Sequence, residues 1–226
     1  QMVCTSPITY KGKDLLDRDL ANLRSAVDAN GATEAFVPAI SPCDVVGNQL
    51  NEFYDDEDEF LYAVADALNV EYRAIVAAGF MLQIDDPRLI NYYVKNPQLS
   101  VDDCRKWAEK QVEAINHSLK GIPLDNVRYH TCYGINMGPR VWDMEMKDYM
   151  DIVLKINAGA YSFEAANQRH EHEWRLWEDL KLPEGKVLIP GVITHSAVLV
   201  EHPELVADRI MRYASVVGRE NVMAGG

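Results

Sequence analysis

The sequence has little positive charge, and this shortage limits the partners that it can bind. Its 226 residues include 22 lysines and arginines against 35 aspartates and glutamates, which gives a net charge of −13 at pH 7. Nucleic acid phosphates and anionic membrane surfaces both require clusters of Lys and Arg. We therefore expect that neither a nucleic acid nor a membrane is a partner of this protein.

Long apolar runs are also missing, and cysteine is scarce. No stretch approaches the roughly 20 apolar residues that a membrane-spanning helix needs. Residues 1–7 lack the basic region and the apolar core of a signal peptide. Four cysteines in a chain of this length do not suggest a disulfide framework. A reducing, cytoplasmic location is the simplest interpretation of a chain whose cysteines are Cys4, Cys43, Cys104 and Cys132.

What the sequence contains instead is a regular alternation of strand-like and helix-like segments. Alternation of this kind predicts parallel strands that are joined by right-handed helical crossovers. The first crossover lacks the Gly-x-Gly-x-x-Gly pattern of dinucleotide-binding folds, and we find no linker that would divide domains. We expect one α/β unit over residues 1–226, with strands at 2–10, 34–40, 79–85, 127–133, 158–163, 187–194 and 221–224. The predicted helices span residues 13–30, 57–78, 100–119, 144–157, 167–180 and 203–218.

Polar side chains capable of chemistry fall where these predicted strands end. In a (β/α)8 barrel the carboxyl ends of the strands converge on one mouth, which carries the active site. So few strands cannot close such a barrel, and neither end of the sequence resembles a natural terminus, so we expect an incomplete (β/α)8 barrel from a longer protein. The strand-end residues, in chain order, are Asp85, Asp86, His130, Cys132, Glu164 and His195.

His130, Cys132 and Glu164 are candidate ligands for a metal ion. Side chains at positions i and i+2 of a strand point to the same face, so an imidazole and a thiol would project together. With the carboxylate of Glu164 on the next strand, these donors suit a zinc ion that keeps room for a further ligand. A buried cysteine, a hydrogen-bonded histidine and a glutamate that caps the next helix would explain the same residues.

Asp85 and His195 are the other candidates for function. Pro87 forces the residue before it to be extended, so Asp85 and Asp86 stand at a fixed strand exit. Adjacent strand residues point in opposite directions, so only one of the two acids faces the mouth, where Asp85 could hold a substrate ammonium. Capping of the following helix is the competing explanation. His195 is a candidate acid or base because the pKa of imidazole lies near neutrality, although a single histidine also serves structural roles.

Two charged segments are less suited to function. Residues 169–173, Arg-His-Glu-His-Glu, fall in a predicted helix, where side chains two positions apart diverge. We therefore expect His170 and His172 to be solvated or at a rim and not to share an ion. The acids of residues 55–59 precede a predicted helix, where negative charge is favourable, and indicate a solvated helix start.

Four motifs together resemble those of the catalytic domain of cobalamin-independent methionine synthases. They are Gln83-Ile-Asp-Asp-Pro87, Tyr129-His-Thr-Cys-Tyr133, Ala160-Tyr-Ser-Phe-Glu164 and Gly191-Val-Ile-Thr-His-Ser196. The run from Phe163 to Trp174 resembles shorter, stand-alone relatives of that family. Two features depart from the family pattern: Asp86 stands where glutamate is usual, and residues 134–143 form an extra loop.

The resemblance implies a (β/α)8 barrel with a zinc ion that is held by His, Cys, Glu and a second Cys. His130, Cys132 and Glu164 correspond to the first three ligands, and the second Cys would lie beyond Gly226. The resemblance also implies that Asp85 binds the amino-acid substrate and that His195 is a catalytic histidine.

The implied activity is a zinc-dependent methyl transfer from methyltetrahydrofolate (5-methyltetrahydropteroyltri-L-glutamate) to the thiol of homocysteine, which yields methionine. Within this class, the acceptor could be another thiol of the coenzyme M type, or the donor a methylcorrinoid protein. The related uroporphyrinogen-decarboxylase barrel, a lyase without zinc, is disfavoured by His130, Cys132 and Glu164. A non-catalytic barrel that retains zinc is a third alternative.

Overall fold

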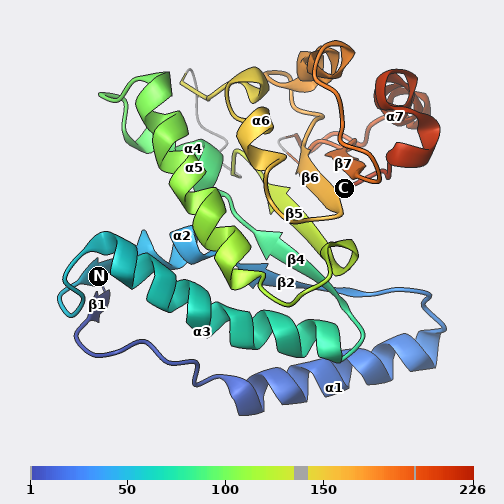
Figure 1. Ribbon diagram of the computed structural model, residues 1–226. Coiled ribbons are helices and arrows are strands. Elements are labelled where there is room, and N and C mark those ends of the chain that lie inside the picture. Colours follow the sequence, from blue (N-terminus) through green and yellow to red (C-terminus); the bar gives the residue numbers. More distant parts are fainter. Residues whose placement is uncertain (1, 135–141, 196) are drawn as a thin grey trace.

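Five parallel strands form the main sheet of the protein, for which we use a computed structural model that describes residues 2–134, 142–195 and 197–226. The strand order is β2-β4-β5-β6-β7, so each strand lies beside the next one along the chain except for an excursion between β2 and β4 (Figure 1). All pairings are parallel. The strands are β2 (Phe36–Ile40), β4 (Met81–Asp85), β5 (Val127–Thr131), β6 (Ala160–Glu164) and β7 (Val187–Gly191).

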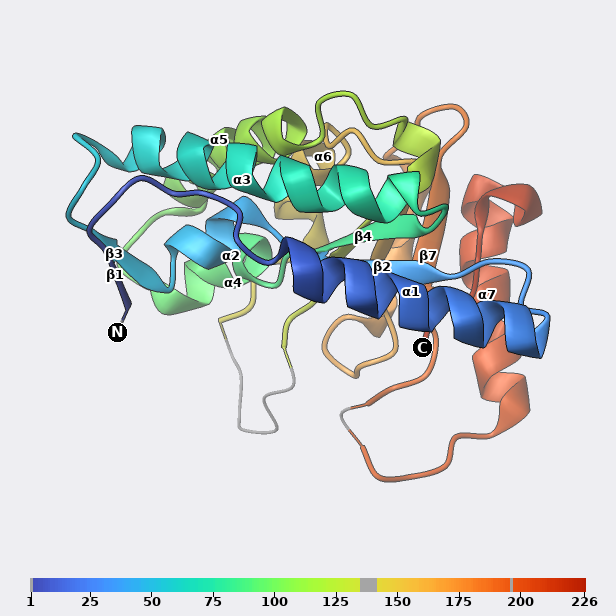
Figure 2. The ribbon, with the colours of Figure 1, turned by 90° about the horizontal axis from the view of Figure 1, so that it is seen from below.

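Helices connect the strands, as the parallel pairing requires. Figure 1 shows α3 and α5 lying across one face of the sheet, and Figure 2 shows the same two helices on one side in a view from below. The α-helices are α1 (Lys13–Asn30), α2 (Pro42–Val46), α3 (Glu57–Ala77), α4 (Arg88–Lys95), α5 (Val101–Ser118), α6 (Met150–Val153) and α7 (Pro203–Val217). Four 3-10 helices are η1 (Leu124–Asn126), η2 (Met146–Asp148), η3 (Glu171–Glu178) and η4 (Arg219–Asn221).

The core lies between the helices and one face of the sheet. Along β5 and β6 the side chains alternate between buried and half-buried, as expected when only one face is covered. Tyr129 and Tyr161 point into the core and are at most 1% exposed. On the opposite face, half-buried positions such as Arg128, His130 and Ser162 line the inner side of the curved sheet.

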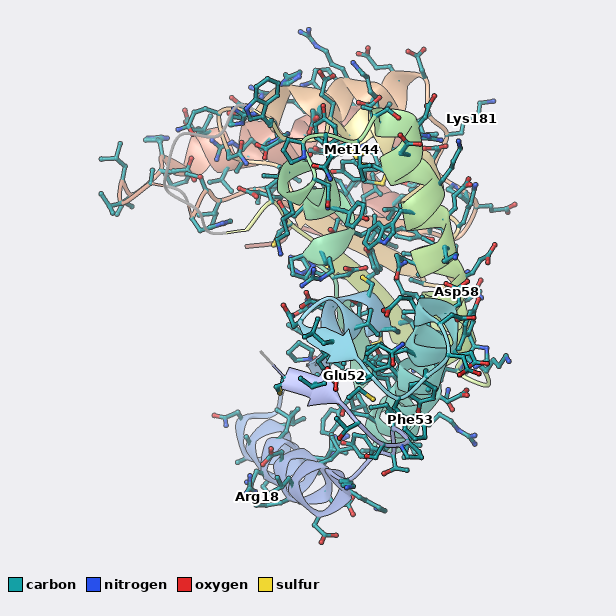
Figure 3. All side chains as sticks on the ribbon, turned by 90° about the vertical axis from the view of Figure 1, so that its left-hand side faces the viewer. Arg18, Glu52, Phe53, Asp58, Met144 and Lys181 are labelled. Carbon is teal, nitrogen blue, oxygen red and sulfur yellow. The ribbon has the colours of Figure 1, made fainter. Side chains whose placement is uncertain are left out.

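Within the described residues, the sheet curves but does not close into a barrel. Seen edge-on in Figure 3, the chain forms an arc, with the α1 end near Arg18 far from the opposite end near Lys181. After β7, only isolated parallel bridges to Val222 and Gly225 extend the sheet. None of the helices in the described ranges combines the length and the apolar character that crossing a bilayer requires.

The structure differs from the sequence-based prediction in several places. The strand predicted at 221–224 is not formed, and only an isolated bridge at Val222 lies within that range. The strand predicted at 2–10 is only β1 (Met2–Cys4), which pairs with the unpredicted β3 (Gln49–Asn51) outside the main sheet. The helix predicted at 144–157 is split into η2 and α6, and the one at 167–180 contains η3 in place of an α-helix. The short helices α2 and α4 were not predicted, because fewer than three turns give little periodic signal.

The starts and ends of the long helices follow local signals that the sequence displays. Ser100 and Asp103 form the capping box of α5, with each side chain bonded to the backbone of the other residue. Gly31 ends α1 in the left-handed conformation, with φ of 62°, which glycine adopts without strain. Asp56 begins α3, and its Oδ1 accepts hydrogen bonds from the backbone N–H groups of Asp58 and Glu59.

We predict that Asp56→Ala lowers the free energy of unfolding by about 1 kcal/mol, because the first turn of α3 loses its N-cap. Urea denaturation followed by circular dichroism measures the change. The matched control is Asp55→Ala, which removes a neighbouring acid and leaves the cap in place. Equal destabilisation by the two substitutions would contradict the capping role of Asp56.

Candidate active site

The carboxyl ends of β4 and β5 meet at a cavity that contains three of the predicted site residues. Asp85, the last residue of β4, is paired in register with His130 of β5. Thr131, between His130 and Cys132, is 1% exposed and points into the core. The expected placement of His130 and Cys132 on one face is therefore confirmed. The cavity, of about 430 Å³, is lined by Pro38, Ala39, Ile40, Asp44, Asp85, Pro87, His130 and Cys132.

A hydrogen bond joins Asp85 to His130 across these strands. Oδ1 of Asp85 lies 3.0 Å from Nδ1 of His130 and also accepts a 2.6 Å bond from Nε2 of Gln83. Burial opposes ionisation of Asp85, but the hydrogen bonds from His130 and Gln83 outweigh it and lower the pKa of the carboxyl. Because an ionised carboxylate only accepts, His130 donates from Nδ1, and its Nε2 is left to face a ligand.

Other side chains on the inner face of the sheet hold Asp85 and His130 in place. Nε of Arg128 donates to Oε1 of Gln83 at 2.5 Å, so Gln83 connects Arg128 to Asp85. The guanidinium of Arg128 also stacks over the ring of Phe36, 3.6 Å from its centroid. Side chains from β2, β4 and β5 thus form a continuous row that fixes the orientation of Asp85.

Glu164 ends β6 and lies next to the turn that contains Cys132. Thr131 and Phe163 are paired in register, so Cys132 and Glu164 are the next neighbours on β5 and β6. The carboxylate of Glu164 accepts bonds from Nδ2 of Asn167 at 2.7 Å and from the backbone N–H of Tyr133 at 3.3 Å. Glu164 therefore lies at the predicted strand end and is held by two donors.

His195 follows β7, and its side chain lies near Glu164. Its Nε2 is 3.9 Å from Oε1 of Glu164, and its side chain is 46% exposed. The segment that carries His195 is tied to α7, because Glu201 accepts from the N–H of Thr194 at 2.8 Å and from Arg209 at 2.7 Å. An exposed imidazole beside a carboxylate is suited to exchanging protons with a bound molecule.

The donors fit a zinc ion in kind and in strand position. Imidazole nitrogen, thiolate sulfur and carboxylate oxygen are the usual zinc donors, and His130, Cys132 and Glu164 occupy adjacent strand ends on the same face. Within the ranges that the structure describes, however, no three His, Cys, Asp or Glu side chains are grouped so that they could hold an ion together. The zinc-ligand assignment of the three residues therefore stays a prediction.

Asp86 points away from the cavity, which confirms that the two adjacent acids face opposite ways. It is 0% exposed, and burial raises the pKa of its carboxyl. Its oxygens accept from the thiol of Cys43 at 3.1 Å, the hydroxyl of Tyr129 at 3.0 Å and the N–H of Leu89 at 3.1 Å. Asp86 thus caps the first turn of α4 and joins that helix to β5 directly behind Asp85.

The solvated or rim role expected for His170 is wrong. His170 is 4% exposed, and its ring stacks on Tyr133 with a centroid distance of 3.6 Å. Its Nδ1 and Nε2 lie 2.9 and 3.2 Å from the carboxylates of Glu173 and Asp143. Helical spacing could not reveal this burial, because the covering residues come from elsewhere in the chain. His172 is exposed, as predicted. Within the predicted extra loop at 134–143, residues 135–141 lie outside the described residues.

Comparison with known proteins identifies similar chains. No family model matches the sequence. The methionine synthase of Thermococcus kodakarensis is 27% identical over 187 residues, which cover 82% of this chain and 48% of the relative. The methionine synthase of Pyrococcus furiosus is 27% identical over 178 residues, 78% of this chain and 44% of the relative. The chain thus spans about half the length of the curated relatives that it matches.

A solved structure shows the same fold. The B12-independent methionine synthase of Shewanella sp. W3-18-1, determined in complex with selenomethionine, superposes with a TM-score of 0.70. The match covers 97% of this chain and 60% of that chain at 18% sequence identity. The fold prediction of an incomplete (β/α)8 barrel is confirmed. Together these comparisons also confirm the resemblance to cobalamin-independent methionine synthases.

We predict that Asp86→Ala lowers the free energy of unfolding by about 3 kcal/mol or more, because buried donors on Tyr129 and Leu89 lose their acceptor. Urea unfolding measures this change. Asp125→Ala, at an exposed position before β5, serves as the control and should leave stability within about 0.5 kcal/mol of the wild type. A loss below 1 kcal/mol for Asp86→Ala would contradict the structural role assigned to this carboxyl.

Proposed function

We propose that the protein is a zinc-dependent methyltransferase that moves a methyl group from methyltetrahydrofolate to the thiol of homocysteine. The observation that carries this proposal is the grouping of Asp85, His130 and Cys132 around one cavity at the carboxyl ends of β4 and β5. The similarity to curated methionine synthases supports the same reaction. We further propose that residues 1–226 form a single partial barrel that belongs to the catalytic domain of a cytoplasmic enzyme.

In this proposal, His130, Cys132 and Glu164 hold the zinc ion. Zinc, when bound, would deprotonate the substrate thiol near neutral pH while leaving its sulfur nucleophilic. Asp85 supports His130 as a ligand, because its hydrogen bond to Nδ1 fixes the ring and leaves Nε2 for the metal. Carboxylates commonly orient metal-binding histidines in this way.

Asp85 also has the chemistry to bind the amino group of homocysteine. Its contacts with His130 and Gln83 both use Oδ1, so in the described residues Oδ2 is left for the substrate ammonium. The lowered pKa keeps this carboxyl ionised at neutral pH. A charge-assisted hydrogen bond between carboxylate and ammonium is stronger than one between neutral groups.

His195 is proposed to supply a proton to the methyl donor. As the thiolate sulfur forms its bond to the methyl carbon, the bond from that carbon to the folate nitrogen breaks, and the nitrogen takes up a proton. The side chain of His195 is exposed and stands beside Glu164, with its Nε2 3.9 Å from Oε1. Delivery of this proton makes the tertiary amine a better leaving group.

Two substitutions should separate metal binding from proton delivery. Cys132→Ser should abolish both zinc binding and methyl transfer, because a hydroxyl is a far poorer ligand than a thiolate. His195→Asn should retain zinc and slow methyl transfer by about 10²–10⁴-fold, the usual contribution of a positioned acid or base. Zinc content is measured by elemental analysis, beside the rate of methionine formation. Loss of zinc in His195→Asn would refute the proton-delivery role.

Asp85→Asn should chiefly raise the KM for homocysteine, because the ammonium loses a charged partner. The comparison substrate is 4-mercaptobutyrate, which is homocysteine without its amino group, and its reaction should be far less sensitive to this substitution. Equal loss with both thiols would contradict the ammonium-binding role.

Running the wild type with methyltetrahydrofolate and with methylcobalamin identifies the donor, and transfer from methylcobalamin alone would overturn the folate assignment.

A further inference from the structure

A buried polar cluster lies behind Cys132 and Glu164, and no step of the proposed reaction uses it. We call Tyr133, Tyr149, His170 and Glu173 the polar clamp; each is at most 7% exposed. The hydroxyl of Tyr133 lies 3.0 Å from that of Tyr149 and 3.4 Å from Oε2 of Glu173. Such a hydrogen-bonded cluster in the core holds its members in a single arrangement.

The polar clamp fixes the backbone that follows Cys132. The ring of Tyr133 is stacked on His170 at an interplanar angle of 10°, and Nδ1 of His170 is bonded to Glu173 at 2.9 Å. Glu173 in turn accepts from the N–H of Met146 at 2.8 Å. The backbone N–H of Tyr133 is thereby aimed at Oε2 of Glu164, 3.3 Å away.

Asn167 holds the other oxygen of the same carboxylate. Its Nδ2 donates to Oε1 of Glu164 at 2.7 Å, the shorter of the two contacts. Its Oδ1 accepts from the N–H groups of Arg169 and His170 at 2.9 and 3.0 Å. Asn167 is 9% exposed, and its amide is held between Glu164 at the end of β6 and the backbone at His170 of the polar clamp.

We propose that Asn167 is a positioning residue that sets the orientation of the Glu164 carboxylate for metal binding. This inference rests on the proposed function, in which Glu164 is a zinc ligand. Each oxygen of a carboxylate has two lone pairs, so Glu164 can accept these hydrogen bonds and still coordinate an ion. Groups that hydrogen-bond to metal ligands fix their direction, and their loss commonly weakens metal binding by about 10–100-fold.

Asn167→Ser distinguishes this role from a purely structural one. A serine hydroxyl can replace Oδ1 as the acceptor for the turn at Arg169 and His170, but it is too short to replace the Nδ2 donor to Glu164. The thermal midpoint should therefore remain near that of the wild type, whereas the metal-binding behaviour changes. Asn157→Ser, at an exposed position, is the matched control.

The full protein is titrated with Zn²⁺ against a chromophoric chelator. We expect Asn167→Ser to bind zinc about 10–100-fold more weakly, with no change for Asn157→Ser. In the zinc-free protein, hydrogen-exchange mass spectrometry should show faster exchange at the Tyr133 amide in Asn167→Ser, because Glu164 is then free to turn away.

The outcomes separate this inference from the proposed function. If the wild type binds zinc and Asn167→Ser matches it in both affinity and exchange, Asn167 has no positioning role. If the wild type binds no zinc, the proposed function fails, and the exchange rate at Tyr133 alone decides whether Asn167 orients Glu164.

Discussion

The parallel register of β4, β5 and β6 is the constraint on which the candidate site depends. It places Asp85 opposite His130 and sets Cys132 beside Glu164, so side chains far apart in sequence meet at one edge. A shift of one residue in β5 would turn His130 into the core and bring Tyr129 to the cavity. The chemistry of the site therefore rests on backbone pairing, and the side chains of the core hold that pairing in place.

Buried polar groups on the core side stabilise the same strand ends. Asp86 joins β4, α4 and β5 through its bonds to Leu89 and Tyr129, and the polar clamp does the same for the turn after β5. Burying a polar side chain without hydrogen-bond partners is costly. Asp86 and the members of the polar clamp are hydrogen-bonded to groups from different elements. The residues that face the cavity are thus held from behind by a second set of hydrogen bonds.

The sheet and the cavity residues could be predicted because their signals are local. The alternating direction of side chains along a strand and the position at strand ends sufficed to bring Asp85, His130 and Cys132 together. The burial of His170 could not be predicted, since it depends on Tyr133 and Asp143, which are distant in sequence, and a helical pattern makes such a residue look solvated. The bond between Asn167 and Glu164 is close in sequence, but only the turn geometry before η3 reveals it.

The proposed zinc ion would bind at these strand ends through nitrogen, sulfur and oxygen donors of His130, Cys132 and Glu164. Zinc-edge X-ray absorption on the purified full protein tests this proposal most directly. We expect one zinc per chain with sulfur at about 2.3 Å and nitrogen or oxygen at about 2.0–2.1 Å, and loss of a sulfur contribution in Cys132→Ser. A zinc-free protein, or a zinc shell without sulfur, would contradict it.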